Sequence, residues 1–443
     1  MITDKKIGLI SLGCDKNRVD SERILALSEE KCTITSSIED ANIIIINTCA
    51  FLESARKESI DTVLECNELR SKNLEKIVLT GCLPEKFIDE IFDELTEVDV
   101  FLGINDYDLL FDALTMAYNG ERVKFVKNNK KLSIKNRKLT TPCHYFYLKI
   151  ADGCNNKCTY CLIPKIRGNY VSYKIEDLVD EVKRLGESKE IILVAQDITK
   201  YGVDLYGEPK LVQLIRELSA LTEVNKIRLL YAYPDMLTDE VISEIKNNDK
   251  VIKYLDIPLQ HASDGVLKKM NRKGTFSEYI TLIEKLKSEI PNIAIRSTFI
   301  AGFPGETKKD FKTLCKFLKM AKLTNCGFFA YSREEGTPAY RLPDQIDEKV
   351  KQKRVKKLYA IQKRISKNNL KKFVGKTISV ICDGIDYDAQ SFYGRAYFSA
   401  PDIDGRVYFS SNELINQGEI YKVKILKTND YDLYGVVNDE FAQ

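Results

Sequence analysis

The chain has 443 residues, a length that suggests roughly two to four domains. Hydrophobic residues make up 44% and charged residues 30%, as in an ordinary globular protein. No apolar run approaches the roughly 18 residues of a membrane span, and the first residues lack the apolar core of a signal peptide. Twelve cysteines are too few for a disulfide scaffold. We therefore expect a cytoplasmic protein, not held in a membrane, whose thiols bind metal or are simply buried.

The first part of the chain alternates short apolar runs with helical patterns, which predicts an open α/β domain with a parallel sheet. Each predicted strand runs directly into a cysteine: Cys14, Cys49 or Cys82. In an open parallel sheet the loops at the carboxyl ends of the strands share one edge, where ligands bind. The three thiols could therefore converge on one metal site, although three unrelated buried cysteines remain the alternative. The expected strands are 7–11, 43–46 and 77–80, and the expected helices are 21–30 and 53–71.

Cys154, Cys158 and Cys161 stand in the spacing CxxxCxxC. Iron–sulfur clusters are normally held by four thiolates, so three thiolates on a four-iron cluster leave one iron open to a small molecule. An open metal position is a place for chemistry rather than for structural support, as in catalytic zinc sites. A zinc knuckle or a chance group of buried thiols is the alternative.

Around these cysteines a second βα block predicts six parallel strands, which suggests an incomplete barrel with its active site at the carboxyl ends of the strands. The expected strands are 145–150, 190–195, 226–231, 253–257, 293–300 and 327–331, with helices such as 174–185 and 276–290 between them. Polar or turn-forming residues near the strand ends are candidate cofactor contacts: Gln196, Asp197, Gln260, His261, Arg296, and Gly302 with the turn 303–307 that follows it.

The last part of the chain predicts five short strands and a small antiparallel barrel of the oligonucleotide-binding type. The expected strands are 378–381, 393–397, 405–408, 419–425 and 433–437. Residues 348–372, which carry 11 lysines or arginines and one acid, would link the two barrels. This stretch is either a solvated linker helix, with Val355, Leu358, Ile361 and Ile365 packed on one side, or a contact with RNA.

The remaining cysteines show no comparable arrangement, and we expect them to be inert. They are Cys32, Cys66, Cys143, Cys315, Cys326 and Cys382.

Taken together, these segments resemble the radical S-adenosylmethionine methylthiotransferases over essentially the whole chain. The resemblance implies an N-terminal domain with three cysteines (1–125), a radical S-adenosylmethionine domain (140–370) and a C-terminal TRAM domain (371–443). One departure is Asp15, where the family pattern has proline. The segments that carry the resemblance are Ser11-Leu12-Gly13-Cys14, Asn47-Thr48-Cys49, Lys149-Ile150-Ala151-Asp152-Gly153, Ala195-Gln196-Asp197, Leu255 to Asp264 and Tyr331 to Thr337.

The resemblance also implies the chemistry. A cluster on Cys154, Cys158 and Cys161 would cleave S-adenosylmethionine, and the resulting radical would take hydrogen from the β-carbon of an aspartate in the twelfth protein of the small ribosomal subunit. A second four-iron cluster on Cys14, Cys49 and Cys82 would carry the sulfur, which a second S-adenosylmethionine methylates. The reductant and the sulfur donor would come from outside the chain.

Charge bears on the choice of substrate within the family, because a related activity modifies a tRNA adenosine. Residues 373–443 carry six basic and eleven acidic residues, a local charge of −5, while the whole chain is at +3. An RNA-binding tail should be basic, so an acidic tail suits a basic ribosomal protein better. Ribosomal RNA contact through 348–372 stays open. A non-catalytic iron–sulfur carrier is the alternative from another class, and it should not bind S-adenosylmethionine.

Overall fold

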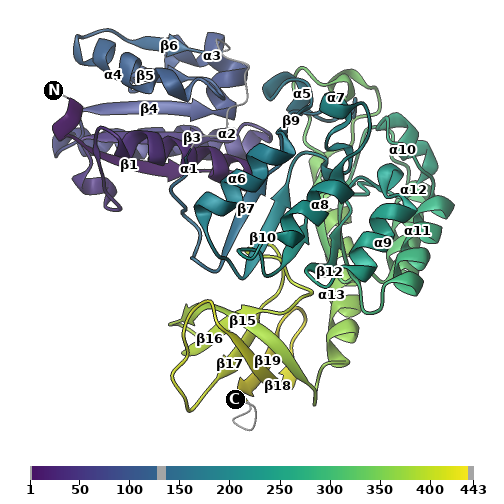
Figure 1. The fold of residues 1–443 in the computed structure, drawn as a ribbon. Helices are drawn as coiled ribbons and strands as arrows, with labels where there is room; N and C mark the ends of the chain where they lie inside the picture. Colours follow the sequence, from purple (N-terminus) through teal and green to yellow (C-terminus); the bar gives the residue numbers. More distant parts are fainter. Residues whose placement is uncertain (1, 127–135, 438–443) are drawn as a thin grey trace.

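The computed structural model describes residues 2–126 and 136–437, which form three regions in succession along the chain (Figure 1). The purple and blue N-terminal region lies beside the teal and green central region, and the yellow C-terminal barrel lies below the central one. Asp439 and Glu440, two acids of the predicted tail, lie outside the described residues. Among the described residues, no helix combines the length and the apolar composition that a membrane crossing requires.

The N-terminal region is a six-stranded parallel sheet in the order β2-β1-β3-β4-β5-β6. Ile43 to Ile46 of β3 are fully buried because helices cover both faces of the sheet. Ile43 and Ile45 pack on the α1 and α4 side, and Ile44 and Ile46 pack on the α2 and α3 side. The elements are β1 (Lys6–Ser11), α1 (Asp15–Glu29), β2 (Thr33–Ile34), β3 (Ile43–Thr48), α2 (Glu53–Asn67), β4 (Lys76–Gly81), α3 (Cys82–Glu94), β5 (Val100–Leu102), α4 (Leu110–Tyr118) and β6 (Val123–Phe125).

Two features of this region differ from the prediction. Helix α1 begins at Asp15, although the apolar pattern indicated a start at residue 21. Its first turns are polar yet buried, with Lys16, Asn17 and Asp20 nearly inaccessible, so hydrophobic periodicity could not reveal them. Strands β2, β5 and β6 were also not predicted, because two or three residues are too few to show a pattern.

The central region contains six parallel strands in the order β14-β13-β12-β11-β10-β7, which confirms the predicted partial barrel. The outer face of this sheet and its helices form the largest apolar core of the molecule. The strands are β7 (Tyr145–Lys149), β10 (Glu190–Val194), β11 (Ile227–Leu229), β12 (Val251–Asp256), β13 (Ala294–Ala301) and β14 (Asn325–Ala330). The helices include α5 (Ile163–Ile166), α6 (Ile175–Leu185), α8 (Leu211–Ala220), α9 (Asp239–Asn247), α10 (Asp264–Lys269), α11 (Phe276–Glu289) and α12 (Lys308–Ala321).

The basic stretch forms one long helix, α13 (Glu348–Lys371), that runs from the central region to the C-terminal barrel (Figure 1). Leu358 is fully buried, and Val355, Ile361 and Ile365 pack against the central core, as the linker-helix interpretation expected. The opposite face of the helix carries most of its lysines and arginines and is exposed.

The C-terminal region is a closed five-stranded barrel in the order β15-β16-β17-β19-β18. Four of its strand pairs are antiparallel, as predicted, and the pair β17–β19 is parallel. The strands are β15 (Thr377–Asp386), β16 (Ser391–Arg395), β17 (Val407–Ser410), β18 (Ile420–Thr428) and β19 (Leu433–Val437).

A buried ion cluster joins this barrel to the central region. Glu190 of β10 accepts hydrogen bonds from Arg228 (2.5 Å) and from Arg395 of the C-terminal barrel (2.8 Å). Arg395 also pairs with Asp383 at 2.8 Å. Burial alone would raise the pKa of Glu190, but the two guanidinium groups outweigh it and bring the pKa down from 4.5 to about 2. The carboxylate therefore pairs with two buried cations that come from two domains, and Asp383 supplies the second negative charge.

Replacing this carboxylate should destabilise the protein. We expect Glu190→Gln to lower the free energy of unfolding by about 3 kcal/mol, because removing one partner leaves buried charges unpaired. Urea unfolding of the purified protein measures the change. Glu419→Gln is the matched control: Glu419 also joins the two regions by pairing with Lys189, but Glu419 is exposed and Lys189 partly exposed, and such a pair contributes about 1 kcal/mol at most. An equal loss in both variants would contradict the role of Glu190.

The same carboxylate should make stability depend on pH. Because its pKa is lower in the folded state, Glu190 contributes its full stabilisation above pH 4.5 and loses it as the pH falls toward 2. We expect the stability difference between the wild type and Glu190→Gln to be constant between pH 7 and 5 and to shrink below pH 4.5. Urea unfolding of both proteins across this pH range measures it. A difference that stays constant down to pH 3 would contradict the assignment.

Candidate functional site

Cys14, Cys49 and Cys82 lie at one edge of the N-terminal sheet. They follow β1, β3 and β4, which are adjacent parallel strands. Gly13 packs so closely on Cys49 that an added Cβ would lie 2.8 Å from the Cβ of Cys49. A Cβ added at Gly81 would likewise lie 2.6 Å from the carbonyl oxygen of Thr48. Both glycines have φ above +90°, which favours glycine over any other residue. The three cysteine loops therefore contact one another, as the strand–cysteine pattern predicted.

The environments of these thiols differ. Cys14 is exposed and Cys82 is buried, with its Sγ 3.8 Å from Asn17 Oδ1 and 4.0 Å from Arg167 Nη2. Burial raises the pKa of Cys82 to about 12, and the neighbouring Cys49 and Cys14 add to the rise while Arg167 opposes it. The thiols are thus close enough to affect one another, and binding of a metal cluster would have to displace their protons.

Cys154, Cys158 and Cys161 lie in the loop between β8 (Ala151–Asp152) and α5. The Sγ of Cys154 accepts a hydrogen bond from the Asn156 amide, and that of Cys161 accepts one from the Ile163 amide, both at 3.4 Å. The Sγ of Cys158 lies 2.8 Å from Tyr233 Oη. Hydrogen bonds to the sulfurs are a recognised means of tuning iron–sulfur clusters, so these residues fit a thiolate-held cluster.

The polar side chains around this loop hold its shape. The side-chain Nδ2 of Asn156 donates a hydrogen bond to Asp197 (3.1 Å), and Asn155 Oδ1 accepts a hydrogen bond from the backbone N–H of Tyr170 (3.0 Å). Gly153 has φ +72°, and a Cβ there would lie 2.0 Å from the Asn169 carbonyl oxygen. Asp197, one of the predicted candidates, therefore positions the cysteine loop.

The predicted cofactor contacts occupy different places. Gln196 donates to Asp152 beside the cysteine loop (3.3 Å), and Gln260 has φ +70° at the carboxyl edge of the barrel. Gly302 has φ +78° and donates its amide to Glu306, which closes the predicted turn. Arg296 instead pairs with Asp256 (3.1 Å) and with Asp404 of the C-terminal barrel (3.4 Å). Contact of these four residues with a cofactor stays a prediction.

His261, another predicted candidate, is fully buried. Burial lowers its pKa to about 3. This histidine is therefore neutral near pH 7 and unsuited to exchange protons there.

Two residues beside Cys158 were not recognised from the sequence. Tyr233 lies against its sulfur, and the guanidinium of Arg272 lies 3.9 Å from the ring centre of Tyr233. Tyr233 and Arg272 lie 75 and 114 positions from Cys158 in sequence, so spacing alone gave no signal for them.

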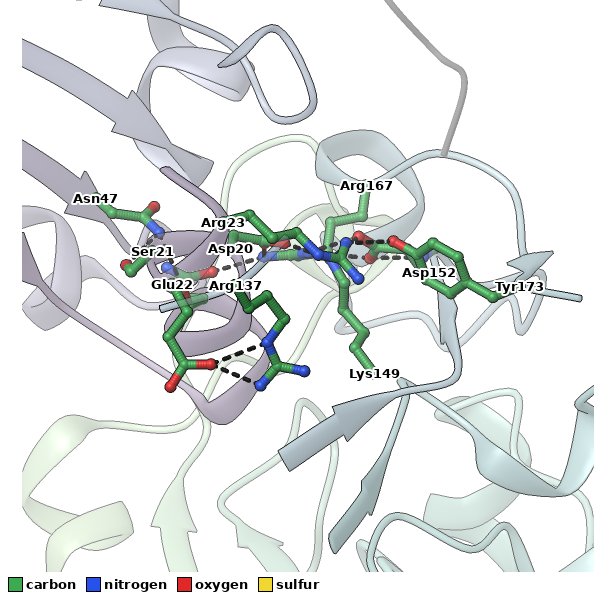
Figure 2. A network of polar contacts seen from close by, with 12 residues as sticks. Asp20, Ser21, Glu22, Arg23, Asn47, Arg137, Lys149, Asp152, Arg167 and Tyr173 are labelled. Carbon is green, nitrogen blue, oxygen red and sulfur yellow. Dashed lines mark hydrogen bonds and ion pairs between the residues drawn. The ribbon is translucent and has the colours of Figure 1, made fainter. Parts of the chain in front are cut away.

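An ion network (Figure 2) lies close to both sets of cysteines: its Arg167 is 4.0 Å from Cys82, and its Asp152 is two positions before Cys154. Arg167, from the loop after Cys161, binds Asp152 (2.8 Å), Asp20 of α1 (3.1 Å) and Asn17 of α1 (2.6 Å). Lys149 also contacts both carboxylates, which are almost completely buried. Burial would raise the pKa of Asp152, but Arg167 and Lys149 lower it well below its usual range. The network therefore joins the N-terminal domain to the cysteine loop of the central domain.

A cavity of about 220 Å³ opens between the two domains. Its lining is largely apolar and includes Phe51 from the N-terminal domain with Tyr160 and Gln260 from the central one. At its rim Arg56 pairs with Glu334 at 2.5 Å. A small group presented here would meet residues that follow Cys49 on one side and residues of the Cys154 loop on the other.

Among the described residues, no group of three His, Cys, Asp or Glu side chains is arranged to hold a single metal ion. The role of the six cysteines as cluster ligands therefore stays a prediction.

Comparison with family models divides the chain as its fold does. Residues 148–318 match the radical SAM superfamily, residues 6–103 match an uncharacterized protein family designated UPF0004, and residues 374–437 match the TRAM domain. Among solved structures, the radical S-adenosylmethionine methyltransferase TsrM from Kitasatospora setae has a similar fold, with a TM-score of 0.57 at 14% identity over 76% of this chain and 77% of its own.

Full-length relatives are much closer in sequence. The ribosomal protein uS12 methylthiotransferase RimO of Acetivibrio thermocellus is 46% identical over 99% of this chain and 100% of its own length. The protein of the same name from Clostridium acetobutylicum is 46% identical over 99% of both chains. These relatives match almost the entire chain, and this chain belongs to the RimO family of methylthiotransferases within the radical SAM superfamily.

Proposed function

We propose that this chain inserts a methylthio group at the β-carbon of an aspartate in ribosomal protein uS12. The observation that carries the proposal is that two domains, each with a three-cysteine set, meet at a small cavity lined by residues close to those cysteines in sequence: Phe51 follows Cys49, and Tyr160 lies between Cys158 and Cys161. The full-length relatives are named for methylthiolation of that ribosomal protein, which supports the substrate. The reductant and the sulfur donor would be external.

Membership of the radical SAM superfamily implies one four-iron cluster and S-adenosylmethionine as cofactors. When bound, this pair supplies a 5′-deoxyadenosyl radical that can remove hydrogen from an unactivated carbon. We assign the cluster to Cys154, Cys158 and Cys161, whose sulfurs accept amide hydrogen bonds or lie against Tyr233. Gln196, Gln260, Arg296 and Gly302 remain the proposed contacts of the nucleotide cofactor.

We further propose that Cys14, Cys49 and Cys82 hold a second four-iron cluster that presents the sulfur. The contacts of Gly13 and Gly81 keep the three loops together, and Cys14 is exposed, which leaves an approach for an external sulfur species. Arg167 places one positive charge beside Cys82, where it favours a thiolate.

The cavity between the domains would receive the substrate side chain. Its apolar lining excludes water from a reactive carbon, which protects a radical from side reactions. The amide of Glu53 and the guanidinium of Arg56 both donate to Glu334, so the rim is held from both domains.

The division of labour between the two cysteine sets can be tested with single substitutions. We expect Cys158→Ala to abolish cleavage of S-adenosylmethionine, because it removes a ligand of the cleaving cluster. Cys49→Ala should keep cleavage and lose methylthiolation. Anaerobically reconstituted protein is incubated with uS12, S-adenosylmethionine, sulfide and a reductant, and both 5′-deoxyadenosine and the mass of the aspartate peptide are measured. Cys143→Ala, an exposed cysteine outside both sets, is the control and should retain both activities.

Methylthiolation by Cys49→Ala would overturn the assignment of the second set. A wild-type protein that modifies tRNA but not uS12 under the same conditions would transfer the assignment to the tRNA activity. Failure of the wild type to cleave S-adenosylmethionine at all would leave the iron–sulfur carrier as the remaining function.

The ion network close to both cysteine sets yields a prediction about stability. We expect Arg167→Met to lower the free energy of unfolding by about 3–5 kcal/mol, because the buried carboxylates of Asp20 and Asp152 would share Lys149 alone. Urea unfolding measures the change. Arg184→Met on α6 is the control, since Arg184 is exposed and forms no ion pair with any described residue. Equal stability of the two variants would show that the network does not hold the domains together.

A further inference from the structure

Helices α12 and α13 pack side by side and leave an open groove of about 620 Å³ between them. Five exposed cations line it: Lys312, Lys316 and Lys319 from α12, and Lys357 and Arg364 from α13. The remaining lining consists of Cys315, Ala360, Ile361 and Ile365. The groove thus has basic walls and an apolar floor.

The charges of this groove have no anionic partners in the part of the chain that the structure describes. None of the five cations forms an ion pair there, and no carboxylate lines the groove. Four other cations of α13 are paired: Arg354 with Glu306 (2.9 Å), Lys351 with Glu348 (3.0 Å), and Lys363 and Lys367 with Asp430 of the C-terminal barrel. The rest of α13 carries further lysines without an ion pair to a described residue, and only the groove sets such cations of α13 opposite cations of a second helix. The groove therefore gathers cations that the fold does not neutralise.

Each wall of the groove is a row of cations along one helix. Lys312 and Lys319 are seven positions apart on α12, and Lys357 and Arg364 are seven positions apart on α13, so each row extends about 10 Å along its helix. Near one end of the groove, Lys351 donates to the Tyr331 carbonyl oxygen at the carboxyl edge of the barrel, and α13 leads from there to the TRAM barrel. The groove lies between the catalytic edge and the C-terminal domain.

We propose that this groove binds the phosphate backbone of double-stranded RNA. Lysine and arginine rows that neutralise phosphates provide affinity without reading sequence. No aromatic side chain lines the groove to stack unpaired bases, which favours a duplex over a single strand. The inference rests on the proposed function, because a ribosomal protein is found on ribosomal RNA: the enzyme would recognise its substrate as an RNA-bound protein rather than as a free one.

The test measures RNA binding directly. Fluorescence anisotropy with a labelled 20-base-pair RNA duplex is recorded for the full chain between 50 and 200 mM salt. Lys312→Glu/Arg364→Glu removes one cation from each wall, and neither side chain forms a hydrogen bond or an ion pair with a described residue. The matched control is Lys183→Glu/Lys246→Glu, which makes the same change in net charge at exposed, unpaired positions of α6 and α9.

We expect the wild type and the control to bind the duplex alike, and the groove variant to bind at least tenfold more weakly. The slope of log affinity against log salt should also fall by about two in the groove variant, about one for each phosphate that is no longer neutralised. Equal binding by the groove variant and the control would overturn the proposal. Thermal unfolding of both variants verifies that each is folded. If the groove variant is not folded, Lys312→Gln/Arg364→Gln, which removes the two charges without reversing them, takes its place.

One further outcome distinguishes RNA from an acidic protein as the occupant of the groove. Another distinguishes failure of this inference from failure of the proposed function. If poly-glutamate displaces the duplex and itself binds more tightly, with the same sensitivity to the groove variant, the occupant is an acidic protein and the proposal is wrong. Methylthiolation of free uS12 by the groove variant should equal that of the wild type, because the groove lies outside the site. If the wild type modifies uS12 but does not bind the RNA duplex, this inference is wrong and the proposed function is unaffected.

Discussion

Buried charges must be paired, and in this molecule that requirement determines how the two cysteine-bearing domains dock. Arg167 and Lys149 of the central domain carry two positive charges, and Asp152 of the same domain supplies only one negative charge. Asp20 of the N-terminal helix α1 completes the neutral group (Figure 2). If the domains separated, Arg167 and Lys149 would share the single carboxylate of Asp152, and one positive charge would be left without a partner. Docking of the two domains therefore completes the pairing of these charges. The same docking brings Cys82 to within 4.0 Å of Arg167.

Hydrophobic pattern and cysteine spacing predicted the parts of the fold that depend on local sequence. The strand–cysteine register, the six parallel strands and the small barrel all follow from apolar runs bounded by turns. What could not be predicted depends on contacts between domains. The first turns of α1 are polar, so the apolar pattern placed the start of this helix at residue 21. Asn17 and Asp20 are nonetheless buried, and both contact Arg167 of the central domain. Arg296, predicted to contact a cofactor, pairs with Asp404 from a strand connection more than a hundred residues away.

The fold also changes what the charge of the C-terminal tail means. Counted along the sequence, residues 373–443 carry −5, which suggested an acidic surface for a basic substrate. Three of these acids pair with cations from outside the tail: Asp404 with Arg296, Asp430 with Lys363, and Glu419 with Lys189. Less negative charge therefore remains for a partner than the count implies. The ribosomal-protein substrate is supported mainly by the full-length relatives and only weakly by this charge.

The pairing of charges elsewhere makes the basic groove informative. Lys312 and Lys316 are four positions apart on α12, and like charges at that spacing destabilise a helix by roughly 0.2–0.5 kcal/mol. Facing cations on α13 add to the repulsion, and no described carboxylate relieves it. The apolar contacts of Leu358 and its neighbours hold α13 in position. Lys316 and Lys357 lie within 6 Å of the ring centres of Phe276 and Phe311, but none of the five cations pairs with a described carboxylate. A polyanion bound along both walls would remove this repulsion between the cations. This is the physical reason to expect the RNA-binding surface in the groove between α12 and α13 rather than on the C-terminal barrel.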